Sequence, residues 1–101
     1  MSKSIMQSDS SYCYLCKKLR GDDFPKVTEE HHVFNGPLRK LSTKYGLTVR
    51  LCVPHHRTGK EAVHLNAQMM HMLKAEGQKV FEQKHPDKDF LKIFGRNYRE
   101  D

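Results

Sequence analysis

The stretch HHVFNGPLRKLSTKYGLTVRLCVPHH, residues 31–56, decides the fold of this chain. Within it, residues 47–52 alternate between apolar and polar side chains, as a half-buried strand does. Residues 26–34, KVTEEHHVF, carry β-branched and aromatic side chains near their ends and predict a second strand. Residues 35–37, Asn-Gly-Pro, break that strand. The two strands therefore form a hairpin with a long connection.

Helical patterns fill the connection and follow the hairpin. Residues 38–46 predict a short helical turn or an ordered loop that ends at Gly46. From Lys60 to about His85, apolar side chains recur at the spacing of an amphipathic helix, and its methionines are typical core residues. Pro86 ends this helix, and the residues after it predict a short terminal helix or docking segment. The fold class expected is α+β.

The chain of 101 residues is long enough for one domain with a modest core. Residues 1–11 are polar and Ser-rich, so we expect a disordered tail there. Residues 12–101 then form a single domain, with a core over about 26–75 and a C-terminal helical extension over about 76–101. No apolar run approaches the roughly 20 residues that span a bilayer, and the first residues lack the apolar stretch of a signal peptide. The sequence predicts a cytoplasmic protein without a membrane partner.

Three cysteines and one histidine form two half-sites with the same spacing. Cys13-x-x-Cys16 and Cys52-x-x-His55 can each hold one ion from a turn, and together they give a tetrahedral set of ligands. Such a closed set is typical of structural zinc. The alternative is that Cys52 is a buried strand residue and the other two cysteines are a chance pair or a redox dithiol.

Positive charge is concentrated in residues 33–60, which contain six basic residues and no Asp or Glu. The other 12 basic residues balance the 12 acidic residues, so the formal net charge of +6 belongs to this segment. A localised basic patch beside a metal site favours a polyanion such as nucleic acid; a solvated surface is the alternative. The candidate phosphate-binding residues are Arg39, Lys40, Lys44, Arg50, Arg57 and Lys60.

Three motifs carry a family resemblance. CYLC at 13–16, EEHHVF at 29–34 and RLCVPHH at 50–56, followed by a helix, resemble the zinc-containing HNH nucleases. More narrowly, residues 31–64 are similar to small HNH-like proteins encoded by bacteriophages and prophages. The resemblance covers roughly residues 13–66 and implies a ββα-metal fold with a zinc knuckle and a long C-terminal helix.

The resemblance also implies roles for the remaining histidines. His32 stands where the family has the general base, while His31 and His56 stand at metal-ligand positions. The implied catalytic ion is Mg²⁺, Mn²⁺ or Ni²⁺, beside a structural Zn²⁺. An ordinary imidazole pKa of about 6.5 suits a base that works at neutral pH.

The chain departs from the family pattern at two positions. The family's central Asn corresponds to about Leu47, so Asn35 is the candidate to orient the base. A third metal ligand is often found four residues after the second, where this chain has Lys60. His64 is the candidate that replaces it.

The function implied is a metal-dependent endonuclease that hydrolyses phosphodiester bonds of DNA, with a possible homodimer. The first alternative is a catalytically inactive HNH-like zinc protein that binds nucleic acid or inhibits a host protein; a phage protein is a further possible partner. The second is a zinc-knuckle regulator unrelated to nucleases, which would hold a single zinc per chain.

Overall fold

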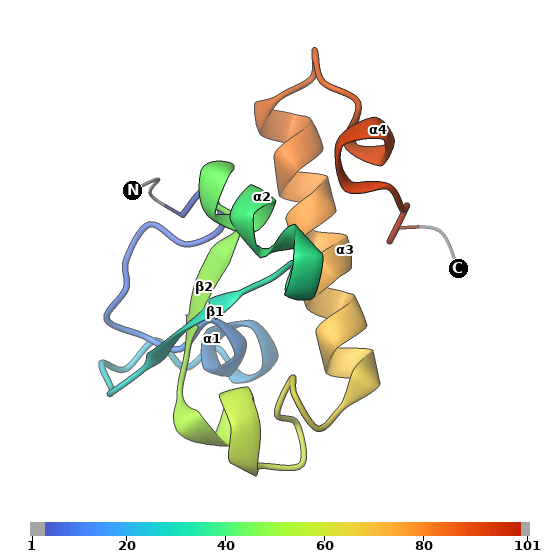
Figure 1. Ribbon diagram of the computed structural model, residues 1–101. Coiled ribbons are helices and arrows are strands. Elements are labelled where there is room, and N and C mark those ends of the chain that lie inside the picture. The colour runs from blue at the N-terminus through green and yellow to red at the C-terminus, as the bar shows by residue number, and fades with distance from the viewer. Residues whose placement is uncertain (1–3, 100–101) are drawn as a thin grey trace.

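The computed structural model describes residues 4–99, which form a small α+β fold (Figure 1). Two short strands, β1 (Glu29–His32) and β2 (Thr48–Leu51), pair antiparallel, with His31 opposite Val49. The predicted hairpin with a long connection is therefore present. The helical elements are α1 (Tyr14–Arg20), η1 (Gly36–Leu38), α2 (Arg39–Lys44), η2 (Pro54–Thr58), α3 (Ala67–Lys84) and α4 (Phe90–Phe94).

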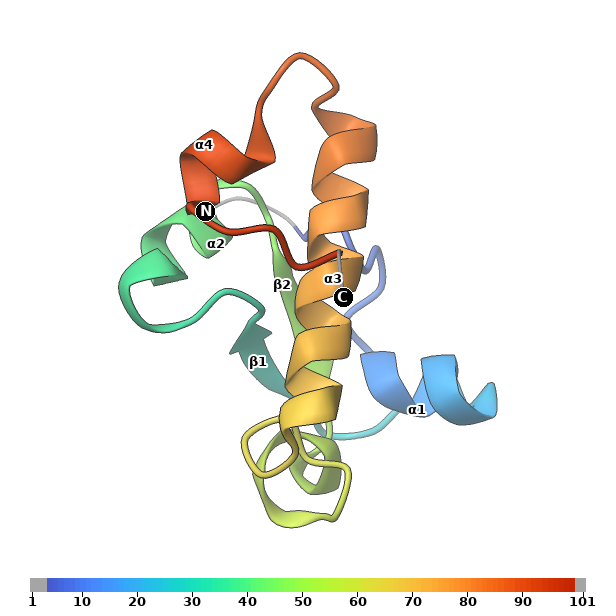
Figure 2. The same cartoon turned by 90° about the vertical axis from the view of Figure 1, so that its right-hand side faces the viewer.

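The long helix α3 runs along the sheet, with η2 near its first residues and α4 beside its C-terminal half (Figures 1 and 2). An aromatic cluster joins these elements: the ring of Phe34, just after β1, lies 4.9 Å from that of Phe94 in α4. Phe81 of α3 and Phe94 meet edge to face, with ring centroids 5.6 Å apart. Burial of these rings holds the C-terminal segment against the strand that carries the histidine pair.

Gly77 explains how closely α3 approaches the end of β1. A Cβ at this position would lie 3.1 Å from the ring of Phe34 and 3.2 Å from a methyl group of Val33. The residue therefore serves close packing, although glycine weakens an isolated helix. The core was expected over about 26–75 and the C-terminal helical extension over about 76–101. Because α3 continues through residues 75 and 76, that boundary falls within one helix.

The helix predicted from Lys60 begins later, at Ala67. Asn66 caps it, since its side-chain oxygen accepts hydrogen bonds from the backbone N–H groups of Gln68 and Met69. Residues 60–66 instead form an irregular loop that buries Ala62. Apolar spacing could not separate a buried loop residue from the first turn of a helix.

The N-terminal segment differs from the expected disordered tail. The backbone N–H of Ile5 donates to the carbonyl of Gly46, and the amide oxygen of Gln7 accepts from the N–H of Arg50 at 2.8 Å. Residues 4–7 thereby cover the edge of β2 that β1 leaves open. Residues 1–3 of the predicted tail lie outside the described residues. Within residues 4–99, no helix has the length and apolar composition needed to cross a membrane.

Candidate metal centres

Cys13, Cys16, Cys52 and His55 converge into one buried cluster that could hold a metal ion. The Sγ atoms of Cys16 and Cys52 lie 3.8 Å apart, and the three sulfurs lie 3.3–3.6 Å from Nδ1 of His55. Ligands placed tetrahedrally at zinc bond lengths are separated by about 3.8 Å between sulfurs and about 3.5 Å between sulfur and nitrogen. The spacing of the cluster matches such a site.

The first two cysteines are placed by a helix rather than by the tight turn expected. Cys13 is the N-cap of α1, and its Sγ accepts a hydrogen bond from the backbone N–H of Cys16 at 3.4 Å. The positive end of α1 thus faces the sulfur, which favours its thiolate form. Burial raises the pKa of the Cys52 thiol to about 11, and the nearby Cys13 adds to that shift. A bound cation would offset the cost of holding several thiolates together.

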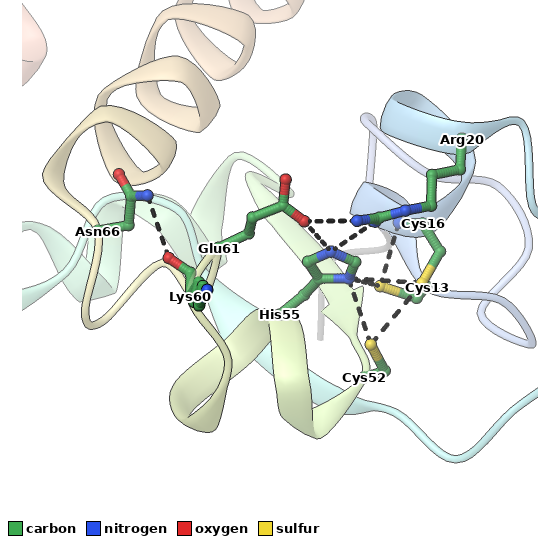
Figure 3. Close-up of polar contacts among 8 residues, drawn as sticks. All are labelled: Cys13, Cys16, Arg20, Cys52, His55, Lys60, Glu61 and Asn66. Atoms are coloured by element: carbon green, nitrogen blue, oxygen red, sulfur yellow. Dashed lines mark hydrogen bonds and ion pairs between the residues drawn. The ribbon is translucent and has the colours of Figure 1, made fainter.

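The far side of the His55 ring is held by charged groups from two other segments (Figure 3). Its Nε2 lies 3.4 Å from a carboxylate oxygen of Glu61, and Arg20 donates to that same oxygen at 2.8 Å. The Glu61 carboxylate favours a proton on Nε2, with the lone pair of Nδ1 facing the sulfurs, whereas a guanidinium nitrogen of Arg20, 3.3 Å from the same Nε2, favours a lone pair there. Arg20 and then His55 lower the pKa of Glu61, so it is a carboxylate at neutral pH.

A π-helical turn sends His55 and His56 to different clusters. The backbone N–H groups of both residues donate to the carbonyl of Cys52, at 3.0 and 2.9 Å. Gly59 closes the turn by donating to the carbonyl of Pro54, and a Cβ at Gly59 would lie only 2.5 Å from that oxygen. Any residue with a Cβ would therefore clash with the carbonyl of Pro54 at this position, so the turn requires glycine here.

His31, His56 and His64 form a second cluster, with ring nitrogens within 4.8 Å of one another. The Nε2 atoms of His56 and His64 are 3.2 Å apart. His31 comes from β1, His56 from η2, and His64 from the loop that follows, where its backbone N–H donates to the carbonyl of His56. Two imidazoles bound to one cation at about 2.1 Å place their nitrogens about 3.0–3.4 Å apart.

His31 is the buried member of this cluster. It is 3% exposed, and its Nε2 is buried without a hydrogen-bond partner in the described residues. Burial, together with the nearby His56 and His64, lowers the pKa of His31 to about 3. The ring is therefore neutral at physiological pH, and a buried nitrogen lone pair without a partner is the state that a metal ligand requires.

Glu29 holds His56 from the side opposite the cluster. Its carboxylate accepts from Nδ1 of His56 at 2.8 Å and from two guanidinium nitrogens of Arg57, at 3.0 and 2.9 Å. Arg57, and then His56, lower the pKa of Glu29 to about 2. The proton of His56 consequently sits on Nδ1, and the lone pair of Nε2 faces His31 and His64.

An open hollow of about 240 Å³ adjoins this second cluster. His32, the predicted general base, lines it together with Asn35 and Arg39. The side-chain amide nitrogen of Asn35 faces the sulfur of Met70 at 3.8 Å. Leu47, which stands where the HNH pattern has its Asn, is fully buried in the core and adds no polar group to the hollow.

The predicted phosphate-binding residues have different partners and surroundings in the structure. Arg57 is paired with Glu29, and Arg50 donates to the hydroxyl and carbonyl oxygens of Thr28 at 3.1 and 2.6 Å. Lys60 lines a separate hollow beside the cysteine cluster. The other three, Arg39, Lys40 and Lys44, are exposed on α2.

Neither of the carboxylates that hold the histidines, Glu29 and Glu61, was predicted from the sequence. Glu29 lies two residues before His31 on the same strand, so strand alternation alone places the two side chains on one face. Glu61 has no comparable signal, because its contact with His55 depends on the irregular loop. No protein-family model, curated protein or solved structure matches the chain.

Proposed function

We propose that the protein is a metal-dependent endonuclease that hydrolyses phosphodiester bonds of DNA, built on the ββα-metal arrangement of the HNH nucleases. One observation carries this proposal: the unpartnered, buried Nε2 of His31 converges with His56 and His64 beside an open hollow that contains another histidine, His32. A purely structural histidine cluster would not require a hollow that a substrate can enter.

The two clusters suit different ions. Three thiolates and one imidazole, all buried, favour zinc with a structural role. Three imidazoles that include an exposed residue leave room for further ligands, and they favour Mn²⁺ or Ni²⁺ over Mg²⁺, which prefers oxygen. When bound, such an ion polarises a phosphoryl oxygen and stabilises the leaving oxygen.

The residues of the chain supply the remaining chemistry. His32 is half-buried in the same hollow and accepts the proton of the attacking water. Arg39, exposed at the rim, binds the phosphate. Glu29 keeps the lone pair of His56 directed at the cluster.

Plasmid cleavage tests the proposal. The zinc-loaded protein is incubated with supercoiled plasmid and Mg²⁺, Mn²⁺ or Ni²⁺, next to the variants His32→Ala and His85→Ala. His85 is a matched control, because it is also half-buried but packs against Tyr45 and Phe81 at the end of α3. We expect cleavage by the wild type and His85→Ala, and a loss of about 10²–10⁴-fold in His32→Ala. Intact plasmid with all three ions, or equal cleavage by His32→Ala, contradicts the proposal.

The burial of Leu47 favours a second candidate, an HNH-like protein that binds DNA without cutting it. In this candidate no amide stands at the family's position, and Asn35, which lines the hollow, does not replace it. This candidate predicts that wild type and His32→Ala bind a DNA duplex equally and that neither cleaves it.

A further inference from the structure

A second hollow, of about 150 Å³, lies beside α3 on the side where the C-terminal segment docks. Lys74 of α3 and Arg96, which follows α4, both line it. The ammonium of Lys74 lies 5.6 Å and the guanidinium carbon of Arg96 lies 5.3 Å from the centroid of the Tyr98 ring. Tyr98 is buried, and its backbone N–H donates to the side chain of Gln78 at 2.7 Å. A fixed aromatic ring thus gathers two cations at one place.

The two cations of this hollow have no acidic partner among the described residues. Within residues 4–99, neither Lys74 nor Arg96 forms a hydrogen bond or ion pair with a carboxylate, whereas the neighbouring Arg99 is paired with Glu82. Burial, and then the nearby charge of Arg96, lower the pKa of Lys74, as is expected for two cations held close together. An anion bound between them would relieve this repulsion.

The position of the hollow relates it to the histidine cluster. Met70 lines it, and the sulfur of Met70 contacts Asn35, which lines the hollow of His32. Lys74 also contributes to the lowered pKa of His31. The two hollows are therefore neighbours on the molecule, separated by the contact between Met70 and Asn35.

We propose that Lys74 and Arg96 bind a backbone phosphate of DNA that flanks the phosphate at the histidine cluster. The identity of the ligand rests on the proposed function, because the second hollow alone specifies only an anion. Arg96 supplies several planar donors and Lys74 a compact charge, while Tyr98 holds both in place. This contact positions the strand and reads no base sequence.

Salt-dependent binding tests this assignment without requiring cleavage. A fluorescein-labelled DNA duplex is titrated with the zinc-loaded His32→Ala protein between about 50 and 200 mM salt, and gels verify that the DNA stays intact. The double variant Lys74→Gln/Arg96→Gln is compared with Lys79→Gln/Lys92→Gln. The control removes the same charge from exposed positions of α3 and α4 that do not line the hollow.

We expect Lys74→Gln/Arg96→Gln to weaken binding about tenfold and to reduce the slope of log K against log salt by about one, the effect of one lost phosphate contact. The control should change the slope much less. An unchanged slope, equal effects of the two double variants, or no binding by the parent protein overturns the proposal. If the plasmid stays intact but the slopes of log K against log salt change as expected, the proposed nuclease activity is rejected and the proposed phosphate site is retained.

Discussion

Two clusters that could each hold a metal ion contain consecutive residues, His55 and His56, yet their ligand atoms and their exposure differ. The first buries three sulfurs and one imidazole, although Cys16, Cys52 and His55 stay 6–8% exposed where they line a hollow. The second has three imidazoles, of which His64 is exposed beside a hollow. A closed, anionic set stabilises the fold, whereas an open, neutral set keeps coordination positions for a substrate. One π-helical turn thus directs two consecutive histidines into two clusters with different ligand chemistry.

Removing one ligand from each cluster should produce the largest difference in folding stability between the two clusters. We expect Cys52→Ser to abolish cooperative folding, a loss of more than about 5 kcal/mol, because a domain of this size has little stability to spare without its metal. His64→Ala should stay folded, since its side chain is exposed and contributes no core packing. Thermal unfolding followed by circular dichroism, with one equivalent of Zn²⁺, measures both variants. Similar melting temperatures for the two would show that the cysteine cluster does not maintain the fold.

The carboxylates behind the two histidines offer a finer comparison. Glu29 lies 2.8 Å from His56, and Glu61 lies 3.4 Å from His55. We expect Glu29→Gln to weaken the binding of Ni²⁺ to the zinc-loaded protein by about 10–100-fold, because a neutral amide holds the His56 tautomer less firmly. Glu61→Gln should alter zinc affinity far less, since the three thiolates dominate that site. Calorimetry measures the affinity for Ni²⁺, and competition with a chelator measures the affinity for Zn²⁺. Equal losses of affinity in the two variants would contradict the prediction that the two carboxylates differ in importance.

The first cluster was the more predictable from sequence, for a physical reason. The spacing of Cys13 with Cys16, and of Cys52 with His55, is a local property that short turns and helices preserve. The two strands also followed from local alternation, because each has one face against the core. Grouping His31, His56 and His64 required the family resemblance, since no local spacing joins them.

Features that depend on distant contacts escaped prediction. The ordering of residues 4–7 requires Gln7 to meet Arg50, 43 positions away. The pairing of Arg57 with Glu29 removes charge from the predicted basic patch, although these residues are 28 positions apart. Charge counted along a segment is therefore a weak guide to charge on a surface. Lys74 and Arg96 demonstrate the converse, because two residues outside that segment meet over one aromatic ring.

The last substitution concerns His31, the buried member of the second histidine cluster. We expect His31→Leu to raise the free energy of unfolding by about 1–3 kcal/mol, because it removes a buried nitrogen that has no partner in the described residues. Urea denaturation with one equivalent of Zn²⁺ and no other divalent ion measures the change. His64→Leu is the control, since that exposed position gains little from an apolar side chain. A loss of stability in His31→Leu would contradict the inference that the buried imidazole of His31 reduces the stability of the fold.

The pH dependence of this gain sharpens the prediction. The pKa of His31 is about 3 in the folded protein, against an ordinary value of 6.5. As pH falls below about 6.5, the unfolded chain takes up a proton at this residue that the folded protein excludes, so wild type loses stability until the pH reaches the folded pKa. Leucine has no such proton, and the other titrating groups are common to both proteins. The advantage of His31→Leu should therefore grow by about 1 kcal/mol between about pH 6.5 and pH 5.5. If the difference in free energy of unfolding between His31→Leu and wild type stays constant over that range, water reaches the His31 ring in the folded protein. Its Nε2 would then not be a buried, unpartnered nitrogen that suits a metal ion.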